Sequence, residues 1–381
     1  MLVPPTAIDI ATVTPILGEV AAVLGLVDDN ILGNSIIVFD GNLNIINKFP
    51  RKNYYLTSFS PDGCHLRSIK YIDAGFVIRE IDFYGAETRQ TAALSTDSED
   101  GTKIYQFNLS PSGRWLAYKV VDQIEMSMAG SKIQDVKLLE VNEQTPQKVL
   151  RLTERSGARP ARPTWSLDSR FLAYTDYDEA GVIQIYIYNP DEKREAQITD
   201  FGLEMKDHEI QILSWAPNSL AIAFSIVGLT ETEEGGIKLT DNGALGVIFL
   251  PDINLKWINL KGFENPILAN HYMAGSTTLW WSKDSQELLI PFSLETVDNT
   301  IRYLAWYDIT QDEVVHLLPD SDFPEKGDYF WKAFPINDLN KIGVFGDKVF
   351  YVYQRNSKVI TEVKKEFIFL ENSVFFSYLT L

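Results

Sequence analysis

One short phrase recurs along the chain and constrains its fold more than any other feature. An aromatic residue or leucine is followed by serine, alanine or proline, then by turn-forming residues, and in the regular copies it ends in glycine or serine. The copies are Phe59–Gly63, Leu109–Gly113, Trp165–Ser169, Trp215–Ser219, Trp281–Ser285 and a degraded copy, Phe334–Asp338. The mean period is 55 residues, so a chain of 381 residues has room for about seven units. Repeats of this length indicate one supersecondary unit used many times.

Each copy of the phrase lies between segments with β-strand character. Proline presets φ, Asp or Asn bonds to its own backbone, and glycine accepts a positive φ, so the phrase predicts a tight hairpin. Segments such as Arg170–Tyr174 and Ile183–Tyr188 follow the hairpin, and the second alternates apolar and polar residues. Four strands per period, without a sustained helical pattern, predict an all-β fold. We therefore expect a seven-bladed β-propeller of four-stranded antiparallel blades.

The phrase and the Leu-Ala-Tyr that follows it in two copies resemble the repeats of TolB-like propellers, which are related in shape to WD-repeat propellers. The resemblance covers residues 50–345 and implies a fold, because scaffolds, peptidase domains and lyases all carry such repeats. We expect a single domain over residues 1–381, with blades starting near residues 19, 54, 104, 162, 210, 277 and 329. The tail Phe367–Leu381 is expected to complete blade one and close the ring, which removes exposed sheet edges. A tail packed outside the ring is the alternative.

Charge and cysteine content exclude several classes of function. The formal net charge is −18, which repels a phosphate backbone and an anionic membrane surface. A single cysteine, Cys64, forbids an intrachain disulfide and a cysteine-rich metal site. No apolar stretch is long enough to span a bilayer, and no Lys or Arg precedes Lys48. We expect a cytoplasmic protein without nucleic-acid binding or membrane insertion. A periplasmic or extracellular location is the alternative if the given sequence lacks a signal peptide.

Motifs that carry chemistry do not occur in the sequence. It has no Gly-x-Ser-x-Gly, no phosphate-binding glycine loop and no His-Glu-x-x-His. The chain resembles oligogalacturonate lyases in length and repeats, and that resemblance implies a metal held by clustered histidines. The four histidines here, His65, His208, His271 and His316, are dispersed. We therefore predict no catalytic residue, no cofactor and no metal site.

The long connections of the repeats fall at one end of the predicted ring, opposite the short phrase hairpins. Long loops on one side of a rigid scaffold are where binding usually resides. The candidate binding residues on that face are Arg155, Arg159, Arg162, Asp176, Tyr177, Asp178, His208, His271, Tyr272, Tyr329 and Trp331. We leave open that the arginines form structural ion pairs and that Tyr272 and Trp331 pack between blades.

These residues predict a non-catalytic scaffold propeller that binds a protein or peptide partner, either alone or within a larger assembly. Aromatic residues and arginines are enriched at interaction hot spots, which favours this function. The alternative is a propeller enzyme, such as a TolB-like polysaccharide lyase or a glycoside-active protein.

Overall fold

The structure is a computed structural model that describes most, but not all, of the chain. The described residues are 20–23, 35–40, 45–50, 54–59, 65–72, 75–82, 84–91, 102–122, 133–141, 147–148, 163–231, 237–260, 267–268, 279–295, 300–324, 333–345 and 350–363. Contacts divide the chain into two compact units. Unit 1 comprises Met1–Asp9, Asp73–Phe76 and Ala92–Asn259; unit 2 comprises Ile10–Ile72, Val77–Thr91 and Leu260–Leu381. Each unit is described by itself.

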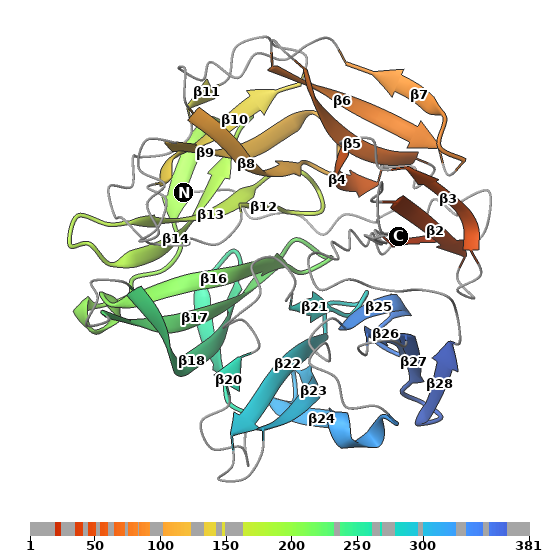
Figure 1. Ribbon diagram of the computed structural model, residues 1–381. Coiled ribbons are helices and arrows are strands. Elements are labelled where there is room, and N and C mark those ends of the chain that lie inside the picture. Colours follow the sequence, from red (N-terminus) through yellow and green to blue (C-terminus); the bar gives the residue numbers. More distant parts are fainter. Residues whose placement is uncertain are drawn as a thin grey trace. The chain divides into compact units, whose positions relative to one another are not determined.

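Unit 1 contains three four-stranded antiparallel sheets whose strands pair in chain order (Figure 1). The third sheet of the chain has β8 (Thr102–Leu109), β9 (Trp115–Asp122), β10 (Ile133–Glu140) and β11 (Gln147–Lys148). The fourth sheet has β12 (Thr164–Trp165), β13 (Leu172–Tyr177), β14 (Ile183–Asn189) and β15 (Arg194–Gln197). A short 3-10 turn, η1 (Leu203–Met205), leads to the fifth sheet, which has β16 (His208–Trp215), β17 (Ala221–Glu231), β18 (Ile237–Phe249) and β19 (Asn254–Ile258).

Unit 2 contains the remaining sheets, apart from Gly75 and Phe76 of the second one, and these sheets are also antiparallel. The first has β1 (Val20–Val23), β2 (Ser35–Asp40) and β3 (Ile45–Pro50), and the second has β4 (Tyr54–Phe59), β5 (His65–Ile72), β6 (Gly75–Asp82) and β7 (Glu87–Gln90). The sixth has β20 (Ile267–Leu268), β21 (Trp280–Trp281), β22 (Glu287–Glu295), β23 (Thr300–Asp308) and β24 (Glu313–Pro319). The 3-10 turn η2 (Asp320–Asp322) follows, and the seventh sheet has β25 (Ala333–Asp338), β26 (Lys341–Phe345), β27 (Phe350–Gln354) and β28 (Val359–Val363).

The all-β prediction is confirmed, since the described residues form antiparallel sheets and only two 3-10 turns. The first sheet has three strands among the described residues. The sixth differs from the expectation, because β20 and β21 both pair with the same edge of β22. Within the described residues no sheet is closed on itself. The predicted closing strand, Phe367–Leu381, lies outside the described residues, so ring closure stays a prediction, as do the seven blades and the single domain.

The repeated phrase forms the same hairpin in each regular copy for which contacts are described. In the fourth sheet, Ser166 N donates to Phe171 O at 2.8 Å and Ser169 N donates to Ser166 O at 2.9 Å. The same two bonds recur at Ser110, Ala216 and Ser282. The last position has φ of +75° at Gly113, +62° at Ser169, +59° at Ser219 and +62° at Ser285. The turn therefore needs a left-handed backbone conformation at this position, and serine adopts it in place of glycine in three copies.

The core of unit 1 lies between facing sheets. The fourth sheet turns Phe171, Ala173, Ile183, Ile185 and Ile187 toward the fifth, where they pack with Ile210, Leu213, Trp215 and Phe224. Its other face packs Leu172 and Tyr174 against residues of the third sheet. Successive side chains along β13 and β14 point to opposite faces of the sheet, and both faces are buried. This is expected for a sheet stacked between two others.

The outer parts of β17 and β18, between residues 228 and 245, form a strand-paired hairpin. The β17–β18 ladder continues through Leu229↔Leu239 to Glu231↔Ile237. β16 pairs with β17 only as far as Gly228, and β19 pairs with β18 only as far as Leu245. The hairpin therefore extends beyond the four-stranded part of the fifth sheet.

Candidate functional site

The structure describes four of the predicted binding residues: Asp176, Tyr177, Asp178 and His208. The other seven, Arg155, Arg159, Arg162, His271, Tyr272, Tyr329 and Trp331, lie outside the described residues. Their assignment to a binding face stays a prediction.

All four described residues lie at the same end of unit 1. The ring of Phe171, just before β13, stacks on that of Trp215, the last residue of β16, with centroids 6.4 Å apart. β13 and β16 are in contact and run in opposite directions at this point, so the last residue of β13, Tyr177, lies at the end where β16 begins with His208. We call this end the loop end of unit 1. It comprises the turn 178–182, the connection 198–207, and the adjoining ends of β13, β16 and β19.

Asp178 organises the turn between β13 and β14. Its Oδ1 accepts hydrogen bonds from Ala180 N and Val182 N, both at 2.9 Å, and its Oδ2 accepts one from Gln184 Nε2 at 2.9 Å. Gly181 has a φ of +75°, which suits glycine in this turn. Partial burial of Asp178 raises the pKa of its carboxyl, whereas these hydrogen bonds lower it. The effect of the hydrogen bonds is the larger, so the pKa lies below its usual value. Asp178 is thus held as a fixed anion.

Gln184 ties the Asp178 turn to the connection that leads to β16. Its side chain is fully buried. Besides Asp178, its Nε2 donates to Phe201 O at 3.0 Å, while its Oε1 accepts from Phe201 N at 3.0 Å and from Thr199 Oγ1 at 2.8 Å. Every hydrogen-bonding group of the amide is therefore used. Because a buried amide without partners is costly, this network fixes the backbone at Phe201.

The connection 198–207 is held at both of its ends. Ile198 N donates to Ile185 O at 2.8 Å, which prolongs the edge of the fourth sheet, and η1 closes with Met205 N donating to Gly202 O at 2.9 Å. A Cβ atom placed on Gly181 would lie 4.0 Å from Lys206 Cε, so the two loops are neighbours. Met205 packs against the core of unit 1.

His208 and Asp176 are partly or fully buried at this end. Asp176 is 3% exposed, and its Oδ1 accepts a hydrogen bond from Tyr177 N at 2.8 Å. The half-buried His208 begins β16 opposite Gly228. Its Nδ1 is buried and has no hydrogen-bond partner among the described residues. Tyr177 packs on the core of unit 1. The structure therefore brings the four residues to one end of the unit.

Two exposed apolar residues at the loop end were not predicted from the sequence. Leu203 in η1 is 68% exposed, and Trp257 in β19 is 43% exposed. Leu203 follows the buried Phe201 by two residues, and the ring centroid of Phe201 is 6.0 Å from that of Trp257. Gln184 was also missed. The sequence feature that could have identified it is a polar residue between two isoleucines, in a strand that is buried on both faces.

No group of three or more His, Cys, Asp or Glu side chains that could hold a metal ion occurs among the described residues. His316 lies in unit 2, where its Nε2 is 2.6 Å from the hydroxyl of Tyr353 and its ring packs on Trp306. Burial in this contact lowers the pKa of His316, and the positive charge of Arg355 adds to the effect. This histidine packs between the sixth and seventh sheets. The arrangement at the loop end can present the fixed carboxylate of Asp178 and the apolar side chains of Leu203 and Trp257 to a ligand.

Comparison with solved structures shows the fold. Porphyromonas gingivalis dipeptidyl peptidase 4 is 12% identical over 82% of this chain and 47% of its own, with a TM-score of 0.57. A Mycobacterium tuberculosis puromycin-hydrolyzing peptidase is 10% identical over 94% of this chain and 55% of its own, with a TM-score of 0.51. This chain spans about half the length of each. The Agrobacterium tumefaciens protein described as a putative TolB is also similar, 15% identical over 79% of this chain and 89% of its own, with a TM-score of 0.41.

No family profile matches the chain, and the search of curated proteins found no match. The predicted resemblance to TolB-like proteins is therefore confirmed only as a propeller-type, all-β fold. Within the described residues, no helix is long and apolar enough to cross a membrane.

Proposed function

We propose that this chain is a recognition propeller that binds a protein or peptide segment at the loop end of unit 1. The observation that carries the proposal is the Gln184 network. Four hydrogen bonds from one buried side chain join the Asp178 turn to the connection before β16. A surface fixed in this way loses little conformational entropy when a ligand binds, which favours affinity.

The polar groups of the loop end support binding over bond-breaking chemistry. Asp178 caps its own turn and stays ionised, and Gln184 is saturated by the chain itself. His208 Nδ1 is buried, so a ligand at the surface does not reach it. Such an arrangement orients a ligand and leaves its bonds unchanged.

Peptide selection followed by hydrogen exchange tests this proposal. Phage-displayed random peptides of twelve residues are selected on the intact protein, and an enriched peptide is synthesised. We expect it to slow amide exchange in residues 178–182 and 198–208. The phrase hairpins 110–113 and 166–169, at the opposite end of the same unit, serve as the internal control.

Failure to enrich any peptide, or protection confined to the phrase hairpins, would overturn the proposal. Turnover of a polysaccharide by the purified protein, with no peptide binding, would instead favour the enzyme alternative. The larger assembly that the sequence suggested remains a further proposal, since a peptide bound at the loop end could belong to a neighbouring subunit.

A further inference from the structure

Exposed apolar side chains are few in the described residues, and two of them share a neighbour. The exposed large hydrophobic residues are Tyr84, Leu203, Ile253, Trp257 and Val359. Leu203 follows Phe201 by two residues, and the ring of Phe201 packs on Trp257. We call Leu203, Trp257 and the buried Phe201 the Leu203–Trp257 surface. Exposed apolar side chains that share a buried neighbour, one of them a tryptophan, are typical of interaction sites.

The indole of Trp257 is held in place by a packed group of rings. Its centroid is 5.6 Å from that of Phe224 in an edge-to-face arrangement, and Phe201 and Phe224 are 5.9 Å apart. Phe224 is fully buried, and it lies over Gly246, where a Cβ atom would be 2.5 Å from its ring. The glycine lets Phe224 lie against β18 and support Trp257. A rigid aromatic side chain makes contact area available at a low entropic cost.

The position of Leu203 is fixed from the other side. Gln184 bonds to both backbone polar groups of Phe201, and Lys206 N donates to Leu203 O at 3.1 Å. The leucine thus projects from a closed turn whose start is anchored in the buried network. Both halves of the surface are therefore preorganised.

The charges beside the surface indicate what kind of partner fits it. Asp200 and Glu204 flank the segment Phe201–Leu203, and both side chains are exposed. Neither makes an ion pair or a hydrogen bond with any described residue. Lys206 and Lys256 lie nearby and have contacts of their own. The two carboxylates, on a chain with a net charge of −18, attract a basic partner.

We propose that the Leu203–Trp257 surface docks an extended protein segment in which an apolar side chain is flanked by arginine or lysine. The apolar side chain packs on Leu203 and the edge of Trp257. A guanidinium group stacks on the exposed indole and pairs with Asp200 or Glu204. This inference rests on the proposed function and deepens it by naming the chemistry of the partner.

The test uses a peptide enriched from the random twelve-residue library on the intact protein. We expect the enriched sequences to contain Leu, Ile, Phe or Trp next to two or more Arg or Lys residues. Binding of one labelled peptide is then measured by fluorescence polarisation. Leu203→Ser is expected to weaken binding at least fivefold, since the exposed leucine supports no core. The double variant Asp200→Asn/Glu204→Gln is expected to weaken it at least fivefold and to reduce its salt dependence.

Tyr84→Ser provides the matched control, because Tyr84 is 65% exposed and lies in unit 2. It should leave the affinity within twofold of the parent value. Equal binding by the Leu203 variant, with exchange protection still at 178–182 and 198–208, would overturn this inference and leave the proposed function standing. Enriched peptides without basic residues would overturn it as well. Failure to enrich any peptide would overturn both.

Discussion

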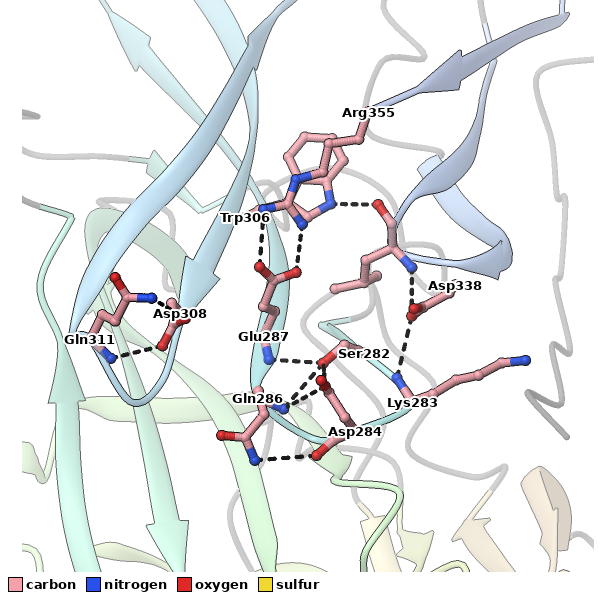
Figure 2. Close-up of polar contacts among 11 residues, drawn as sticks. Ser282, Lys283, Asp284, Gln286, Glu287, Trp306, Asp308, Gln311, Asp338 and Arg355 are labelled. Atoms are coloured by element: carbon pink, nitrogen blue, oxygen red, sulfur yellow. Dashed lines mark hydrogen bonds and ion pairs between the residues drawn. The ribbon is translucent and has the colours of Figure 1, made fainter. Parts of the chain in front are cut away.

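Ser169 holds the hairpin of the preceding sheet in place, because its Oγ accepts a hydrogen bond from Ser112 N at 2.8 Å. The same position of the phrase acts again one sheet later, where Ser219 Oγ accepts from Asp168 N at 3.2 Å. In unit 2, Asp338 Oδ1 accepts from Lys283 N at 3.3 Å (Figure 2). At Ser169 and Ser219, the last residue of the phrase therefore closes its own turn and also bonds to the turn of the preceding sheet.

Two substitutions at Ser169 separate these two roles. Ser169→Ala keeps the left-handed backbone and loses the hydrogen bond, so we expect a loss of about 1 kcal/mol in the free energy of unfolding. Ser169→Gly loses the same bond but relieves about 1 kcal/mol of backbone strain, so we expect a change near zero. Urea unfolding of both variants measures the difference. A glycine variant less stable than the alanine variant would contradict the dual role.

The regularity of the phrase is the reason why so much of the fold could be predicted. Its turn chemistry predicted the hairpins. Its tryptophans also bond to neighbouring sheets, since Trp165 Nε1 donates to Asn108 O at 3.0 Å and Trp215 Nε1 donates to Thr164 O at 3.1 Å. The bond from Ser169 could not be predicted, because it joins residues 57 positions apart whose register depends on how the sheets stack.

The candidate site could be predicted only in part, for a similar reason. Strand direction alone placed Asp176, Tyr177, Asp178 and His208 at one end. The roles of Gln184 and Trp257 depend on which side chains a distant segment brings to them, and a strand pattern carries no such information. Gln184 reads as one polar residue in an alternating run, although all of its partners but one come from the segment 199–201.

Replacing Gln184 with leucine tests whether the network fixes the loop end. Gln184→Leu preserves volume but leaves the N–H and C=O of Phe201 without their partner, so we expect a loss of roughly 3 kcal/mol in unfolding free energy. Native-state hydrogen exchange should also accelerate at the Phe201 amide and along residues 199–207. Unchanged exchange in that segment, together with a global loss of stability, would show that the network supports the core and not the connection.

Gly246 is expected to be intolerant of even a methyl group. Gly246→Ala would place a Cβ atom 2.5 Å from Phe224 Cζ in a fully buried site, so Phe224 or β18 must move. We expect a loss of about 1 to 3 kcal/mol and a change in Trp257 fluorescence. Gly202→Ala is the matched control, because its new Cβ meets only the exposed side chain of Glu204, which can rotate away. Similar losses in both variants would contradict this account.

Arg355 joins the sixth and seventh sheets through a two-pronged ion pair (Figure 2). Its Nη1 and Nη2 lie 2.5 Å and 3.0 Å from the two carboxylate oxygens of Glu287, and its guanidinium lies 5.6 Å from the ring of Trp306. Both charged side chains are about four-fifths buried. A double-mutant cycle with Glu287→Gln and Arg355→Met should give a coupling of about 1 to 2 kcal/mol. A coupling near zero would mean that the pair adds nothing beyond packing.

His316 should make the stability of unit 2 sensitive to mild acid. Burial, strengthened by the positive charges of Arg355 and Lys358, lowers the pKa of His316 in the folded protein. The unfolded chain then binds the proton more tightly, so the contribution of neutral His316 is present above the ordinary pKa of about 6.5 and is lost as pH falls through the lower, folded value. We therefore expect the melting temperature to fall between pH 7.5 and pH 5.

His316→Phe should reduce that fall, although losing the bond to Tyr353 lowers its melting temperature at every pH. Tyr353→Phe removes the same hydrogen bond but keeps the titrating ring, so it should retain most of the pH dependence. If the two variants show the same slope as the parent protein, the acid sensitivity arises elsewhere and His316 is not its source.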